Sequence, residues 1–142
     1  MSKSDAVVTH RGPGRVMIGV YAVFAIAATS RALFQLATRF SQAPIAYSLS
    51  AVAAVIYIVI TVLLWRGTSA SLALARTFII IELIGVLVVG TWSFVDPAAF
   101  PRATVWSHFG EGYGFIPLIL PMVGLYYLRK TNSGSSGSAP EG

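Results

Sequence analysis

Glu82 is the residue whose type and position are most suited to unusual chemistry in this chain. It lies near the middle of residues 70–95, a long stretch in which apolar side chains predominate. A carboxylate at that depth of a bilayer costs about 3 kcal/mol on insertion scales, so proteins neutralise it, pair it or use it. The sequence therefore predicts a polar site inside a membrane-spanning helix.

Arg31, Gln35 and Arg39 are spaced by four and would share one face of an earlier helix. Counted along each helix, Arg31 lies about 9 Å and Glu82 about 16–20 Å from the same membrane edge. An arginine side chain covers much of that difference, so we predict a polar site of Arg31, Gln35 and Glu82, with an Arg31–Glu82 ion pair. The alternatives are that Arg31 extends to the membrane surface, and that Glu82 is protonated, hydrogen-bonded to Ser, Thr or Tyr, or in contact with an ion, a lipid or a partner.

A second polar pair, His108 and Glu111, lies in a predicted outer loop. The two side chains could bind a metal or relay protons, but two ligands are too few to define a metal site. We therefore interpret this outer-loop site as a solvated edge and expect neither a metal nor a cofactor. The glycines at 110, 112 and 114 do not match the nucleotide-binding pattern G-x-G-x-x-G, and they favour a tight entry into the next helix.

The composition indicates that these groups belong to a membrane protein. The 142 residues are 56% hydrophobic and only 11% charged, with a mean hydropathy of +0.75, whereas about 25% of a soluble domain is charged. The net charge is +5, but the basic residues lie at the ends of apolar stretches rather than in one patch. That placement favours phospholipid contacts over nucleic acid. Without cysteine, disulfides and thiolate metal sites are excluded.

Four apolar stretches are candidates for the helices that must position these residues: 16–37, 45–65, 70–95 and 110–128. A bilayer core of about 30 Å needs about 20 helical residues. The fourth apolar stretch covers only about 113–128 by itself and reaches 110–128 with residues from the preceding loop. The predicted fold is all-α, a four-helix transmembrane bundle with a longer outer loop between helices 3 and 4. The bundle would occupy residues 13–130, between a disordered N-terminus (1–12) and a disordered C-terminal tail (131–142).

The outer loop and the last helix contain several breaks. Asp96-Pro97 is a helix-ending signal, and residues 103–109 are expected to form a short helix lying in the membrane interface. Pro117 would fall harmlessly in the first turn of the last helix, and Pro121 should kink it. Gly85, one turn from Glu82, would let another backbone approach that face.

Lysine and arginine predict the orientation. With Arg31 and Arg76 set aside as lying within spans, six basic residues fall on one side and two on the other. Both termini should therefore be cytoplasmic, in a multi-pass protein of a plasma (inner) membrane. The six are Lys3, Arg11, Arg15, Arg66, Arg129 and Lys130, and the two are Arg39 and Arg102.

The run from Trp106 to Arg129 contains Trp-Ser-His-Phe-Gly-x-Gly-Tyr-Gly-Phe-x-Pro-Leu, followed by Gly-Leu-Tyr-Tyr-Leu-Arg. This run resembles small, uncharacterised four-span integral membrane proteins of actinobacteria. The resemblance is confined to this last part of the chain. It implies a bacterial inner membrane and brings no activity with it.

We expect a non-enzymatic integral membrane protein that contacts the lipid bilayer and serves as an accessory or scaffold component of a larger complex, through a protein partner or a homo-oligomer. The alternative is a small oligomeric proton-coupled transporter using Glu82. Such a protein is similar in size to small multidrug-resistance transporters, although their essential glutamate is in the first helix and their charge bias is weaker. A third alternative is an enzyme on lipid-linked substrates, with acid–base groups among Arg39, Asp96, Arg102, His108 and Glu111.

Overall fold

A computed structural model describes residues 12–38, 41, 44–100, 104 and 106–137, with side chains from Gly14 to Lys130 within those ranges. The described chain is all-α, as predicted. Three of its helices are long and apolar enough to cross a membrane, and they match the first three predicted spans. The elements are α2 (Gly12–Thr38), α3 (Pro44–Arg66), α4 (Ser69–Val95), η2 (Pro97–Ala99), η3 (Ser107–Tyr113) and α5 (Ile116–Gly137).

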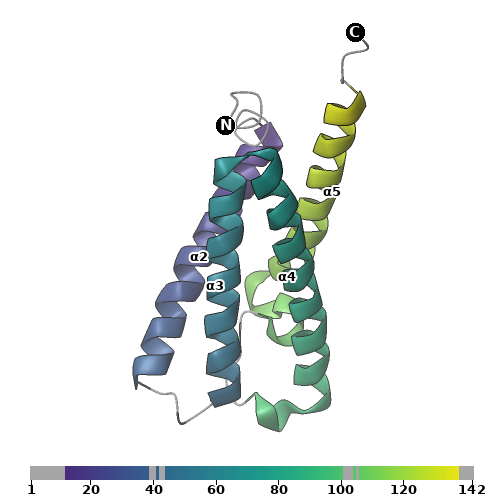
Figure 1. Cartoon of the computed structure of the whole chain (residues 1–142). Coiled ribbons are helices and arrows are strands. Elements are labelled where there is room, and N and C mark those ends of the chain that lie inside the picture. The colour runs from purple at the N-terminus through teal and green to yellow at the C-terminus, as the bar shows by residue number, and fades with distance from the viewer. Residues whose placement is uncertain (1–11, 39–40, 42–43, 101–103, 105, 138–142) are drawn as a thin grey trace.

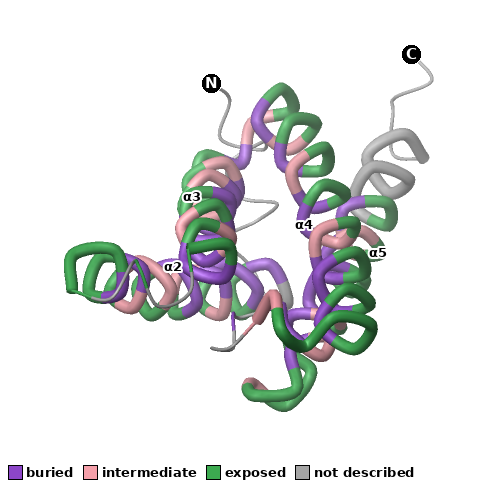
Figure 2. Tube along the Cα trace, turned by 90° about the horizontal axis from the view of Figure 1, so that it is seen from below, coloured by how far each residue is buried: buried purple, intermediate pink, exposed green. Residues whose placement is uncertain are grey.

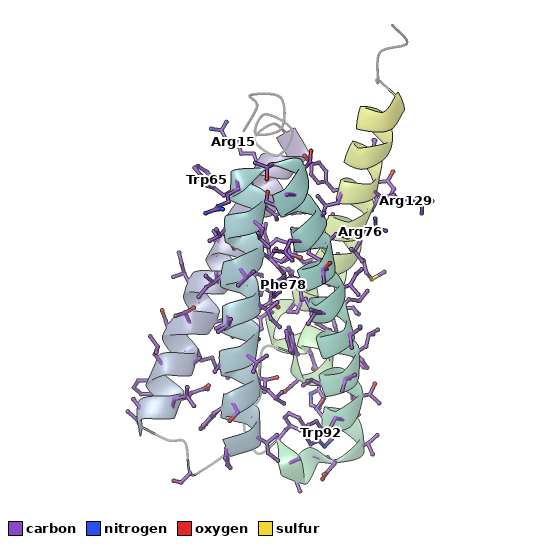
Figure 3. All side chains as sticks on the ribbon, viewed as in Figure 1. Arg15, Trp65, Arg76, Phe78, Trp92 and Arg129 are labelled. Carbon is purple, nitrogen blue, oxygen red and sulfur yellow. The ribbon has the colours of Figure 1, made fainter. Side chains whose placement is uncertain are left out.

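The helices run alternately up and down, so that α2 begins at the end of the molecule where α5 finishes (Figure 1). We call this end the inner end and the opposite one the outer end. Arg15 and Arg129 lie at or near the inner end and Trp92 lies toward the outer end (Figure 3). The position of these two arginines at the same end agrees with the charge pattern of the sequence. That the inner end faces the cytoplasm stays a prediction.

α2 and α3 pack extensively on each other, and both contribute buried small residues. Both helices are rich in alanine, and the backbones of alanine-rich helices can approach closely, which strengthens dispersion contacts within a bilayer. The buried alanines of this pair are Ala25, Ala32, Ala46, Ala53 and Ala54. Farther inward, the two helices contribute larger side chains that are fully buried, including Tyr21, Tyr57 and Ile60.

The turn between α3 and α4 sets the start of the helix that carries Glu82. Gly67 has a φ of +65°, a left-handed conformation that glycine adopts without steric cost at the end of a helix. Thr68 then caps α4: its Oγ1 accepts from Ser71 N–H at 3.0 Å, and Ser71 Oγ accepts from Thr68 N–H at 2.9 Å. This reciprocal capping box satisfies two backbone donors and defines where α4 begins.

The outward faces of the helices are apolar. In Figure 2 the buried residues face one another across the bundle, and the exposed ones lie on its periphery. Water does not solvate such a surface well, whereas lipid chains do, so the surface is consistent with contact with a bilayer. Large apolar side chains on this surface include Val23, Ile26, Leu33, Val55, Ile84, Val88, Ile119 and Met122.

The fourth predicted span, 110–128, does not form as a single helix. Residues 107–113 form η3, and α5 begins only at Ile116. His108, Phe109 and Gly110 have φ values of 52°, 62° and 86°, which interrupt a right-handed helix. Pro117 falls in the first turn of α5, as predicted. Pro121 lies inside the helix, and the kink expected there stays a prediction.

The C-terminal tail also differs from its sequence-based description. α5 continues to Gly137, although the Ser- and Gly-rich composition from residue 131 predicted an unstructured tail. Extending an existing helix requires no new nucleus, so a segment of poor helix formers can continue it. The predicted disordered N-terminus lies outside the described residues except for Gly12, where α2 begins.

Candidate polar site inside the bundle

Glu82 lies at the centre of the molecule. It is thirteen residues from each end of α4, or about 20 Å, and it has no exposed surface. Its Oε1 accepts a 2.7 Å hydrogen bond from Tyr21 Oη of α2. Its Oε2 is also buried and has no hydrogen-bond partner among the described residues. The carboxyl group is therefore anchored on one oxygen only.

Aromatic rings from three parts of the chain surround this contact. Trp106 Nε1 donates a 3.0 Å hydrogen bond to Tyr57 Oη of α3. The centroid of the Tyr57 ring lies 6.2 Å from that of Tyr21 and 5.7 Å from that of Phe24. Phe24 in turn lies 5.7 Å from Tyr113. We call Tyr21, Phe24, Tyr57, Trp106 and Tyr113 the aromatic cluster.

Trp106 reaches this cluster because the chain turns back into the bundle after α4. An added Cβ at Gly85 would lie 2.6 Å from Trp106 Cζ3, so the indole ring packs directly on that glycine. Gly85 is ten residues from the outer end of α4, or about 15 Å. Figure 1 shows η3 well inside the bundle, whereas η2 lies at its outer end. We call the described residues of this stretch, 104 and 106–115, the re-entrant segment.

This path corrects two sequence-based predictions. The expected interfacial helix at 103–109 is not what forms: η3 begins at Ser107, and Trp106 is only 3% exposed. Residues 103 and 105 lie outside the described residues. Gly85 does provide a close approach, but to an indole ring rather than to a helix backbone.

Hydrogen bonds hold the re-entrant segment at its depth. His108 N–H donates to Ser93 Oγ at 2.8 Å, which ties the segment to α4. Within the segment, Trp106 N–H donates to Thr104 Oγ1 at 3.1 Å. Phe115 N–H donates to the Gly110 carbonyl at 3.0 Å. Non-helical backbone is tolerated at membrane depth only where such groups are satisfied within the protein or by water.

The same segment is conformationally strained. His108, Phe109 and Phe115 have φ values between 52° and 62°, a region that costs a non-glycine residue about 1–2 kcal/mol. Packing compensates for part of this cost: the Phe109 ring fills the space over Gly90, and the His108 ring lies 4.4 Å from that of Phe94. Strained residues of this kind tend to occur at functional sites.

Arg31 and Glu82 have different partners from those predicted. Arg31 Nη1 donates to Tyr113 Oη at 2.7 Å, while Glu82 accepts from Tyr21. Along α2, Arg31 lies ten residues beyond Tyr21, or about 15 Å toward the outer end. The register between α2 and α4 therefore brings a tyrosine to the level of Glu82. This fits the alternative that Glu82 is hydrogen-bonded to a neighbouring hydroxyl.

Gln35 is buried one turn beyond Arg31, and its Oε1 has no hydrogen-bond partner among the described residues. It is about 21 Å from Tyr21 along α2. Of the predicted site of Arg31, Gln35 and Glu82, only the first two lie at neighbouring levels of the bundle.

His108 and Glu111 do come together. His108 Nδ1 lies 3.6 Å from Glu111 Oε2, and their side chains are 44% and 62% exposed. Within the described part of the chain, no group of three or more His, Cys, Asp or Glu side chains could hold a metal. Of the acid–base set considered for an enzyme, Arg39 and Arg102 lie outside the described residues.

Sequence reasoning missed Tyr21, Tyr57 and Trp106 as members of the site. Tyr21 and Tyr57 lie within spans rather than at their ends, where tyrosine is usually enriched. A buried tyrosine usually finds a hydrogen-bond partner, so its position inside a span was a usable signal. Trp106 gave no such signal, because its sequence neighbourhood is that of a surface loop.

Comparison with known proteins gives no family for this chain. No protein-family model matches it. Neither the curated proteins nor the solved structures contain a match. The resemblance of residues 106–129 to four-span proteins of actinobacteria therefore stays a prediction.

Proposed function

We propose that this protein is a non-enzymatic accessory or scaffold component of a larger plasma-membrane complex. One observation carries the proposal: two side-chain hydrogen bonds in the middle of the bundle join different elements of the chain itself. Glu82 binds Tyr21, and Trp106 binds Tyr57, which links α4 to α2 and the re-entrant segment to α3. Because these hydrogen bonds join the helices to one another, the bundle would be a rigid body that can present its helix faces to partners.

The outer surface supports the same proposal. The exposed residues of α4 and α5 are mostly large and apolar, which suits contact with lipid or with helices of a partner. The resemblance of residues 106–129 to four-span proteins of actinobacteria adds the expectation of a bacterial inner membrane. Arg15, Arg66, Arg129 and Lys130 would face the cytoplasm and the anionic headgroups there.

A proton-coupled transporter is the second candidate, and a specific observation favours it. Glu82 Oε2 is fully buried without a hydrogen-bond partner among the described residues. The chain is also broken between η3 and α5, and transporters commonly build their sites at breaks of this kind near the membrane midplane. In this role Glu82 would bind and release a proton as part of a transport cycle.

The two candidate functions differ in whether a partner protein is expected to co-purify with the chain. The tagged chain is extracted from its native membrane in mild detergent, and the intact complexes are weighed by mass spectrometry. The accessory proposal predicts a larger partner in fixed stoichiometry, which is retained by the Glu82→Gln variant if that variant keeps the fold. Recovery of the chain alone or as a small homo-oligomer contradicts it. Proton flux in vesicles that is lost in Glu82→Gln would then support the transporter.

A further inference from the structure

We propose that Glu82 and Tyr21 form a proton-binding site in the middle of the bundle, and that Trp106 closes its outer side. The inference goes beyond the accessory role and does not rest on it, because a scaffold and a transporter could both contain such a site. It stands on the geometry of the carboxyl group, the chemistry of its neighbours and the position of the indole ring.

The carboxyl group offers two different oxygens. Oε1 accepts the Tyr21 hydroxyl hydrogen at 2.7 Å, so this oxygen acts as the acceptor of the pair. Oε2 is buried and has no hydrogen-bond partner among the described residues. A proton bound at Oε2 forms one O–H bond and removes the negative charge of the carboxylate, while Tyr21 keeps its own proton. No other reactant is required.

The same surroundings suit a proton better than a metal cation. Hard cations such as Ca²⁺ and Mg²⁺ take about six or more oxygen ligands. Around Glu82 the described structure supplies one carboxyl group and a hydroxyl that already donates to it. No cluster of three or more acidic, His or Cys side chains occurs among the described residues. A proton needs only the carboxyl oxygen itself.

Trp106 lies on the outer side of this site. Its ring packs on Gly85, which follows Glu82 by one helical turn in the outward direction. The hydrogen bond to Tyr57 and the re-entrant backbone hold the ring in place. Glu82 has no exposed surface, so in this proposal a proton arriving from the outer end reaches it when this segment moves.

α5 covers the site from another direction. An added Cβ at Gly124 would lie 3.5 Å from Tyr21 Oη and 3.3 Å from Ile79 Cδ1, so α5 packs directly beside the Tyr21 hydroxyl. α4 and α5 run in opposite directions, and Gly124 is level with Ile79. Pro121 is therefore roughly level with Glu82. This proline is fully buried, so the α5 side is filled by the helix itself.

Infrared spectroscopy of the full chain in micelles of a detergent without carbonyl groups tests the proton site, because phospholipid esters absorb in the same region. The sequence has only five acidic side chains, so few protein carboxyl groups can contribute to this region of the spectrum. We expect a protonated-carboxyl C=O band at neutral pH that disappears in Glu82→Gln. Tyr21→Phe should move this band to higher frequency, because the carboxyl group loses its hydrogen bond. Tyr47→Phe removes another buried tyrosine hydroxyl, which lies near the outer end of α3, and should leave the band unchanged.

Absence of that band from the wild-type protein between pH 5 and 8, roughly the range of physiological titration, overturns the site. So does a band unchanged in Glu82→Gln. A pull-down that finds no partner leaves this result untouched, so the accessory role and the proton site fail separately.

Hydrogen–deuterium exchange of the same band tests the closure. After transfer to D₂O, Trp106→Phe should exchange at least about tenfold faster than wild type, because it keeps a ring over Gly85 but loses the bond to Tyr57. Trp92→Phe is the matched control near the outer end and should exchange at the wild-type rate. Equal exchange rates in all three proteins, with the band intact, overturn the assignment of Trp106 as the closure.

Discussion

The α2–α3 pair and the re-entrant segment are two regions of one bundle that are held together in different ways. The pair consists of uninterrupted helices with several buried alanines. The re-entrant segment has a broken backbone, three left-handed non-glycine residues and specific hydrogen bonds to its neighbours. The difference teaches that regular helices can be stabilised by many interchangeable contacts, whereas an irregular segment at membrane depth depends on a few particular ones.

The difference implies unequal sensitivity to mutation. A single alanine in the α2–α3 pair contributes a small part of a long contact. In contrast, Trp106 links Tyr57 to Gly85, and Ser93 satisfies the backbone of His108. Substitutions around the re-entrant segment should therefore cost more than comparable ones elsewhere. Three predictions test this and a fourth tests the Tyr21–Glu82 contact; none has a larger expected effect on the free energy of unfolding than the one before it.

Trp106→Ala should lower the free energy of unfolding by about 3–5 kcal/mol, the range found for removing a buried tryptophan. The indole is 3% exposed and its N–H is hydrogen-bonded, so both packing and a polar contact are lost. Reversible unfolding in detergent micelles measures the change. Trp92→Ala removes an indole that is 36% exposed and should cost clearly less. Equal losses of unfolding free energy in the two variants would contradict the larger contribution assigned to Trp106.

Gly85→Ala should destabilise the protein by about 1–3 kcal/mol, because the new methyl group overlaps the Trp106 ring. Gly90→Ala should act likewise through the Phe109 ring. Gly19→Ala is the matched control on α2, where an added Cβ meets nothing within 4 Å. It should be neutral or stabilise by up to about 1 kcal/mol through helix propensity. Thermal unfolding of the three variants side by side distinguishes these outcomes.

Tyr21→Phe should cost about 1–3 kcal/mol, because it leaves Glu82 Oε1 buried without its donor. The ring remains, so packing is largely kept. Combining Tyr21→Phe with Glu82→Leu, which removes the acceptor oxygen, should cost less than the sum of the two single changes, since the two side chains are in contact. Strict additivity in this double-mutant cycle would contradict the hydrogen bond.

His108→Gly should be more stable than His108→Ala by up to about 1 kcal/mol, because glycine adopts a φ of 52° without a steric cost. The two variants lose the same ring contact with Phe94, so their difference isolates the backbone. Denaturant midpoints of the pair provide the comparison. A more stable alanine variant would mean that residue 108 is not left-handed.

Much of the fold follows from local sequence. Hydropathy over more than twenty consecutive residues located α2, α3 and α4 closely, because a membrane span is a property of a contiguous stretch. The re-entrant path does not follow from any stretch by itself. It depends on Trp106 meeting Gly85 and Phe109 meeting Gly90, which are contacts between residues about twenty positions apart.

The candidate site, like the fold, could be predicted from the sequence only in part. Glu82 was identifiable because a carboxylate in an apolar stretch is rare, and a tyrosine was among the partner types predicted for it. The particular partner was not predictable, since the register of α2 against α4 decides between Tyr21 and Arg31. That register is set by the packing of whole helices and leaves no trace near either residue.

Cysteine labelling tests the re-entrant path most directly, because the chain has no cysteine of its own. Ser107→Cys places a thiol at a buried position of the re-entrant segment, and Ala98→Cys places one at an exposed position of η2 at the outer end. In intact vesicles or cells, a membrane-impermeant thiol reagent on the outer side should label Ala98→Cys and react with Ser107→Cys only after denaturation. Equally rapid labelling of both would place the re-entrant segment in a surface loop and contradict the account of its buried path.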